Sequence, residues 1–188
     1  ALAQWTQFHG LYVDCTGEGE VAIALAGGVP REHLLLHGVN KSTDDLKSGM
    51  QNAGTIVVDN LNELHRIENL FPNSDAQVPN IWLRLLPGFA VSTHHAYTQT
   101  GPHESKFGKT RDEIMEAAQF CKENNLPLNG IHFHQGSNFR DASPLKAAID
   151  IGLELANEIG FSGKWHLSPG GGWGVAYHED ELPQPGIH

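Results

Sequence analysis

The sequence is poor in basic residues and has no long apolar run, and each shortage excludes a class of protein. Lysine and arginine number 12 against 22 aspartates and glutamates, which gives a net charge of −10. Non-specific binding to nucleic acid requires a basic surface, so we expect no nucleic-acid partner. No apolar run approaches the roughly 20 residues of a membrane-spanning helix, and no leader-like segment is recognised. We therefore expect no membrane partner and a cytoplasmic protein.

Cysteine is also scarce, because Cys15 and Cys121 are the two cysteines of the chain. Disulfides are rare in reducing compartments, so we expect two buried free thiols. The 188 residues correspond to about one domain. Their hydrophobic fraction of 39% and charged fraction of 18% are typical of a folded globular protein.

Short apolar runs alternate with helical patterns along the chain. The predicted strands cover residues 11–15, 33–37, 55–60, 81–87, 130–135 and 165–168. The predicted helices cover residues 20–26, 42–53, 61–70, 111–125 and 142–159. Such alternation predicts an α/β fold with a parallel sheet, either an open doubly wound sheet or a closed barrel.

Polar side chains gather where these predicted strands end. They are Asp14, His37, Asp59, Arg84, His134 and Ser168. Both architectures bind ligands at the carboxyl ends of their parallel strands. The polar residues therefore predict a site at that edge of the sheet without deciding between the two folds.

A glycine-rich run, Gly170-Gly171-Gly172-Trp173-Gly174, follows the last predicted strand. Glycines let the backbone approach a ligand closely, and the exposed N–H groups of such a loop favour a phosphate. A tight strand-to-helix turn is the alternative, although three adjacent glycines exceed what a turn needs.

His132 and His134 belong to a second run, and on a strand they point to the same side. Two such histidines could bind zinc, but no third ligand stands at a characteristic spacing, so we expect no metal. His134, nearer the strand end, is a candidate to stack on a heteroaromatic ring, with Ser137 bonding to a phosphate. His132 is better explained as a hydrogen-bonded core residue.

Three charged residues allow more than one interpretation each. Arg84 interrupts an apolar strand, so it forms either a structural ion pair or a ligand contact. Asp59 is open to the same two interpretations and could instead cap the next helix. Lys41, near a strand end, has either an active-site role or a solvated position before a helix.

Seven segments occur in a fixed order along the chain. They are Thr-Gly-Glu-Gly-Glu (16–20), His-Gly-Val-Asn-Lys-Ser (37–42), Val-Asp-Asn…Glu-Leu (58–64), Leu-Arg-Leu-Leu-Pro-Gly (83–88), Thr-Gly…Ser-Lys-Phe-Gly (100–108), His-Gln-Gly-Ser (134–137) and Gly-Gly-Gly-Trp-Gly (170–174). Together they resemble the fold-type III, pyridoxal-phosphate-dependent decarboxylases over nearly the whole chain.

The resemblance implies a (β/α)₈ TIM barrel of the alanine racemase-like type, here incomplete, with about strands two to seven. Residues 1–188 would be part of the cofactor-binding barrel domain, without the family's C-terminal β-domain. The implied cofactor is pyridoxal 5′-phosphate. The resemblance implies that His134 stacks on its ring and that Arg84 lies beneath it. The phosphate would be held by Ser137, Gly170, Gly171 and Gly172.

Within the family, the resemblance is greatest to decarboxylases that convert meso-diaminopimelate to L-lysine and carbon dioxide. It implies a small amino-acid substrate and a homodimeric full-length protein. The family's Schiff-base lysine, on its first strand, and its Glu-Pro-Gly-Arg motif, on its eighth, have no counterpart in this sequence. We therefore expect this stretch alone to be inactive. An arginine- or ornithine-type decarboxylase, a racemase and a non-catalytic phosphate-binding module are the alternatives. Val39, Ser168-Pro169 and Asn138 depart from the family pattern and bear on the substrate.

Overall fold

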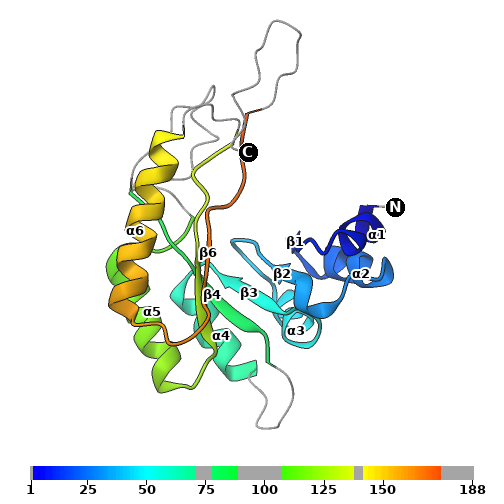
Figure 1. Cartoon of the computed structure of the whole chain (residues 1–188). Helices are drawn as coiled ribbons and strands as arrows, with labels where there is room; N and C mark the ends of the chain where they lie inside the picture. The colour runs from blue at the N-terminus through cyan, green and yellow to red at the C-terminus, as the bar shows by residue number, and fades with distance from the viewer. Residues whose placement is uncertain (1, 71–77, 89–106, 138–141, 175–188) are drawn as a thin grey trace, which may run out of the picture.

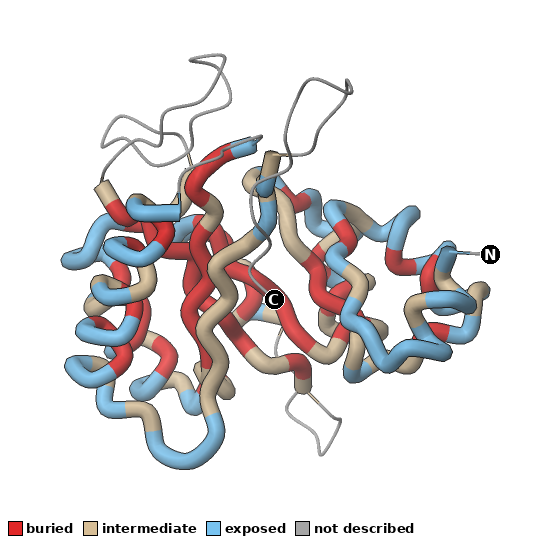
Figure 2. The backbone as a smooth tube through the Cα atoms, turned by 45° about the horizontal axis from the view of Figure 1, so that its top comes forward, coloured by how far each residue is buried: buried red, intermediate tan, exposed pale blue. Residues whose placement is uncertain are grey.

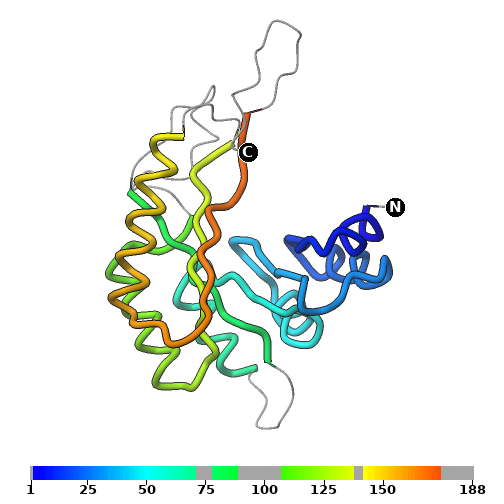
Figure 3. Tube along the Cα trace, in the orientation of Figure 1, coloured from blue at the N-terminus to red at the C-terminus, as the bar shows by residue number. Residues whose placement is uncertain are grey.

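Six parallel strands form one sheet in chain order in the computed structural model, which describes residues 2–70, 78–88, 107–137 and 142–174. The strands are β1 (Val13–Cys15), β2 (Leu34–Leu36), β3 (Thr55–Val58), β4 (Asn80–Arg84), β5 (Leu128–His132) and β6 (His166–Ser168). A doubly wound sheet reverses its strand order at a switch point, whereas each strand here pairs with the next along the chain (Figure 3). The fold is therefore an incomplete TIM barrel, as predicted.

The helices lie outside this sheet. They are α1 (Leu2–Phe8), α2 (Glu18–Ala26), the 3₁₀ turn η1 (Arg31–His33), α3 (Thr43–Asn52), α4 (Leu61–Leu70), α5 (Arg111–Glu123) and α6 (Ser143–Ile159). Figure 1 shows α5 and α6 along one flank of the sheet and α1 to α3 toward its opposite end. None of the helices within the described residues is long and apolar enough to cross a membrane.

Helix α1 and the turn η1 were not predicted. Helix α1 buries none of its residues, and its apolar residues Leu2, Trp5 and Phe8 are all exposed. The remaining helices agree with the prediction within two residues at each end.

Local side-chain chemistry fixes several helix ends. Ser42 Oγ accepts from the Asp45 backbone N–H at 3.0 Å, and the Asp45 carboxylate accepts from the Ser42 N–H at 2.8 Å, which is a capping box. Thr110 and Glu113 form the same box at the start of α5. Gly160, at φ +70°, ends α6 in the left-handed conformation.

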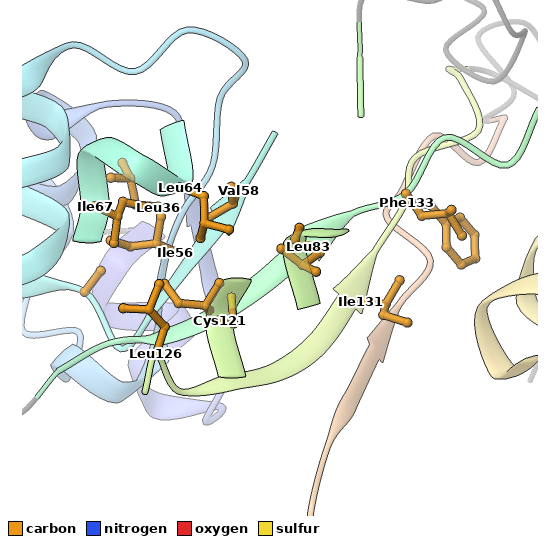
Figure 4. Packing of buried hydrophobic residues seen from close by; sticks show 14 of the residues in the cluster. Leu36, Ile56, Val58, Leu64, Ile67, Leu83, Cys121, Leu126, Ile131 and Phe133 are labelled. Carbon is orange, nitrogen blue, oxygen red and sulfur yellow. The ribbon is translucent and has the colours of Figure 1, made fainter. Parts of the chain in front are cut away.

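Alternate strand residues face opposite sides of the sheet. One row, which includes Leu36, Ile56 and Leu83, packs against the helices in the main core (Figure 4). The other row contributes Leu35, Val57 and Trp82 to a separate cluster on the inner face of the barrel. The sheet is accordingly the most buried layer of the molecule (Figure 2).

Both cysteines are buried free thiols, as predicted. Burial raises the pKa of Cys15 to about 11 and that of Cys121 to about 12. Because the thiolate is the reactive form, both thiols are unreactive at neutral pH.

Part of one predicted segment lies outside the described residues, namely Thr-Gly…Ser-Lys at 100–106. Asn138 also lies outside the described residues.

Removing the Ile56 side chain should be costly, because Ile56 is 0% exposed between sheet and helices. We expect Ile56→Ala to lower the free energy of unfolding by about 2–5 kcal/mol, as for other buried isoleucines. Urea denaturation measures the loss. Ile23→Ala is the matched control, because Ile23 is 71% exposed on α2, and its effect should stay within about 0.5 kcal/mol. Equal losses in the two variants would contradict this packing.

Candidate functional site

A layer of polar residues lies at the carboxyl ends of the strands, two positions beyond the inner-face row. Arg84 follows Trp82 in this way, and His132 follows Gly130. Arg84 and His132 are paired in the strand register, as are His132 and Ser168. The side-chain contacts join these residues across the sheet, so the sequence correctly predicted that polar groups converge at this edge.

Two histidines meet in the middle of this layer. The rings of His37 and His132 are 4.5 Å apart, edge to face. His37 Nδ1 lies 3.2 Å from Asp14 Oδ2, and His132 Nδ1 lies 3.0 Å from Ser168 Oγ. The Nε2 atoms of both rings are buried without a hydrogen-bond partner among the described residues. Buried nitrogens of this kind are suited to face a polar ligand.

His132 is the buried, hydrogen-bonded histidine that the sequence predicted, with 5% of its surface exposed. Burial, and then His37 and Arg84, hold its pKa well below the usual value. Burial also lowers the pKa of His134, and Arg84 adds to the effect. Both imidazoles are therefore neutral at neutral pH. The described residues contain no group of three or more potential metal ligands.

Arg84 forms an ion pair, which was one of its two interpretations. Its Nη1 donates to Asp59 Oδ1 at 3.0 Å, and both side chains are buried. Its guanidinium also lies 4.8 Å from the centre of the Phe107 ring. Burial lowers the pKa of Arg84, and Asp59 opposes this. Asp59 does not cap α4, because Asn60 Oδ1 accepts from the Glu63 N–H instead.

Lys41 is not solvated, so that interpretation was wrong. It is 3% exposed, and its ammonium donates to Glu63 Oε1 at 2.5 Å, Val57 O at 2.7 Å and Gly38 O at 2.8 Å. Burial lowers the pKa of Lys41, and Glu63 opposes this. The ion pair joins the loop after β2 to the end of β3 and the start of α4.

Lys109 is a second buried lysine, and the sequence did not predict its burial. It is 2% exposed, and its ammonium donates to Val58 O at 2.7 Å. Burial lowers its pKa to about 8, with Glu63 and Asp59 opposing. The signal available in the sequence was Gly108, directly before Lys109, because a glycine permits a tight turn. In the structure Gly108 has φ +75°, and Lys109 pairs with Leu85 beside the sheet.

The glycine run packs closely on the loop after β5. A Cβ atom on Gly172 would lie 1.8 Å from the carbonyl oxygen of Gly136, and one on Gly170 would lie 2.8 Å from His134 Nδ1. Gly170 and Gly172 also have positive φ values of +70° and +97°. Close approach therefore requires both residues to be glycine. Gly171 is different, because a Cβ there would meet nothing within 4 Å.

Ser137 and His134 lie on either side of the point where the glycine run makes this contact. Ser137 is exposed, directly after Gly136, and His134 is half-buried against Gly170. The structure therefore places His134 against the glycine run, and Ser137 directly follows the contact in the chain. The role of these residues in binding a phosphate stays a prediction. These residues form one edge of the polar layer, and Arg84 lies beside them on β4.

The residues present fit a phosphorylated heteroaromatic cofactor. A glycine cradle with an open middle residue suits a phosphate, because no side chain keeps the ligand away from the backbone N–H groups. A neutral imidazole at His134 suits a flat ring. The buried Nε2 atoms of His37 and His132 add polar atoms that face the same layer.

Comparison with known proteins agrees with this arrangement. Residues 1–186 match the sequence profile described as the pyridoxal binding domain of pyridoxal-dependent decarboxylases. Diaminopimelate decarboxylase of Bacillus subtilis is 33% identical over 191 residues, covering 97% of this chain and 43% of that protein. The enzyme of Corynebacterium efficiens is 32% identical over 190 residues, covering 97% and 41%.

A solved structure gives the same result. Diaminopimelate decarboxylase from Helicobacter pylori, complexed with L-lysine, superposes with a TM-score of 0.84 at 26% identity. The match covers 95% of this chain and 46% of that one. The chain thus spans less than half the length of the relatives it matches.

The buried ammonium of Lys109 should make stability depend on pH. Its pKa is about 8 in the folded state against 10.5 for an ordinary lysine, so the unfolded state binds more protons between these values. Stability should therefore rise with pH across that window and be lowest below pH 8. Wild type should gain about 2 kcal/mol in free energy of unfolding between pH 7 and pH 10, and Lys109→Met should not show this gain.

Urea denaturation at both pH values measures this difference. Lys122→Met on the exposed face of α5 is the matched control and should show the same gain as wild type. A Lys109→Met difference that is constant with pH would contradict a depressed pKa.

Proposed function

The chain belongs to the pyridoxal-dependent decarboxylase family, and on that premise we propose that it is the cofactor-cradling part of an amino-acid decarboxylase. Its proposed substrate is meso-diaminopimelate, and its products are L-lysine and carbon dioxide, which places it in lysine biosynthesis. The observation that carries the proposal is the glycine run, packed through Gly170 and Gly172 onto the His134–Gly136 loop. The substrate is inferred from the relatives, which are diaminopimelate decarboxylases.

In this proposal the glycine run and Ser137 hold the phosphate of pyridoxal 5′-phosphate. Gly171 is the residue with open space above it, so its backbone is the part that a phosphate can approach. His134 stacks on the pyridine ring. Its lowered pKa keeps the imidazole neutral, so that it fixes the ring plane without placing a cation against it. Arg84 lies beneath the ring, held by Asp59.

When bound, the cofactor supplies an electron sink for the charge left by loss of carbon dioxide. The protein's contribution is orientation and electrostatics. The charge of Arg84 is balanced by Asp59, and the rings of His132 and His134 beside it are neutral. In this proposal the donors to an anionic phosphate are therefore the backbone N–H groups of the glycine run and the Ser137 hydroxyl.

The family's Schiff-base lysine has no counterpart in these 188 residues, so we expect this stretch alone to lack turnover. We propose that the full-length protein is a homodimer.

A direct assay tests the reaction. We expect the full-length gene product, supplied with pyridoxal phosphate, to release carbon dioxide from meso-diaminopimelate at a higher kcat/KM than from arginine or ornithine. His134→Ala should lower that value by about tenfold or more, since ring positioning is lost. Racemisation without carbon dioxide release would overturn the decarboxylase assignment.

The phosphate role of Gly171 is tested by charge. We expect Gly171→Asp to weaken the binding of pyridoxal phosphate by at least about tenfold, because it sets a carboxylate against the phosphate. Gly171→Ala is the matched control. Its methyl group meets no protein atom within 4 Å, so it tests crowding of the phosphate without charge, and its loss of binding should be clearly smaller than that of Gly171→Asp. Equilibrium titration monitored by cofactor absorbance measures both. Equal affinities in the two variants would remove Gly171 from the phosphate site.

A further inference from the structure

We propose that Glu63 is a positioning residue, which holds Asp59 and through it the guanidinium of Arg84 at the cofactor end of the barrel. Glu63 belongs to α4, on the helix side of the sheet, and touches neither the histidines nor the glycine run in the described structure. It acts through two bonds in series. The assignment of a cofactor to this end rests on the proposed function, but the contacts that carry the inference do not.

The first contact fixes Glu63 itself. Its Oε1 receives the Lys41 ammonium at 2.5 Å, and Lys41 is held in turn by the carbonyl groups of Gly38 and Val57. An ammonium has three donors, and all three are used. Glu63 and Lys41 are 3% exposed each, so both charged groups are removed from water and are held by these bonds.

The second contact passes this rigidity to Asp59. Glu63 Oε2 accepts from the Asp59 backbone N–H at 2.9 Å. A residue in an N-terminal helical turn ordinarily bonds back to the cap residue itself, here Asn60. Glu63 instead bonds to Asp59, one residue before Asn60. Asp59 directly follows β3 and stands on the inner face of the sheet. Glu63 therefore fixes the backbone from which the Asp59 carboxylate projects.

The third contact delivers the effect to the site. Asp59 Oδ1 accepts from Arg84 Nη1 at 3.0 Å, and Phe107 covers the guanidinium. Arg84 is paired in register with His132 on the neighbouring strand. The charges and titrating groups around His134 are Arg84, His37 and Asp14. Displacement of Arg84 would therefore change the pKa of His134.

A role in stability alone would not require this geometry. A buried ion pair contributes little net stability compared with apolar residues of similar volume, although removing one partner is costly. Replacing both charges together avoids an orphaned charge and allows the positioning effect to be measured separately.

The test compares two double variants of the full-length protein that both lack the ion pair. Lys41→Met with Glu63→Gln keeps an acceptor for the Asp59 N–H. Lys41→Met with Glu63→Met has nearly the same volume and no acceptor. NMR titration of histidines labelled at Cε1 measures the pKa of His134 without cofactor. Arg84→Met sets the full size of the effect, and Lys146→Met, which breaks the exposed pair with Asp150, is the control.

We expect the Glu63→Met double variant to raise the pKa of His134 by about half a unit or more, approaching the rise in Arg84→Met, because a nearby cation is displaced. The Glu63→Gln double variant and Lys146→Met should stay near wild type. Equal shifts in the two double variants, or no shift in Arg84→Met, would overturn the proposal. If the Glu63→Met variant does not fold, Glu63→Leu with Lys41→Met removes the same acceptor.

Titration with pyridoxal phosphate separates this inference from the proposed function. The Glu63→Met double variant should bind the cofactor at least about threefold more weakly than the Glu63→Gln double variant. If wild type does not bind pyridoxal phosphate, the proposed function fails, and the His134 titration still decides the positioning role. Equal cofactor affinities with an unchanged His134 would overturn the inference while leaving the function intact.

Discussion

The alternation of side chains along parallel strands is the constraint on which the rest of the structure depends. Because successive residues face opposite sides, one row of apolar side chains on each strand packs against the helices and the other row faces the barrel interior. Polar residues at the strand ends, such as Arg84 and His132, continue the row that faces the interior. A one-residue slip would exchange core and site at once. Fold and site are therefore specified by the same pattern.

Charge at this edge of the sheet is divided between two sides. On the helix side, Lys41, Glu63 and Lys109 lie buried behind the strands. On the barrel side, Arg84 is the cation beside histidines whose pKa values are lowered by burial. Both lysines are bonded to carbonyl groups at the end of β3, so they hold the backbone from which the barrel-side residues project. The buried charges on the helix side thus fix the backbone of the strand ends without occupying the inner face of the barrel.

The parts that could be predicted from the sequence are those with a local cause. The Ser42 cap and the Gly160 terminus depend on neighbouring residues, and the apolar runs located all six described strands, although β4 and β5 each end three residues earlier than predicted. The prediction of a barrel rather than a doubly wound sheet came from the resemblance, because the sequence of a single strand does not show which strand pairs with it. The burial of Lys41 could not be predicted, because its partner Glu63 lies 22 residues away. The glycine run was predicted as a phosphate loop, while the close packing that two of its glycines permit depends on a loop from another strand.

The strictly sequential order of the strands bears on how this chain is made. Each strand from β2 onward pairs with the one synthesised just before it. A chain that leaves the ribosome can add one strand and its helix at a time, and each addition finds a formed edge to pair with. Among the described residues, each new strand pairs with its neighbour in sequence, which shortens the loop closed at each step. The order that curves this sheet toward a barrel also suits assembly during translation.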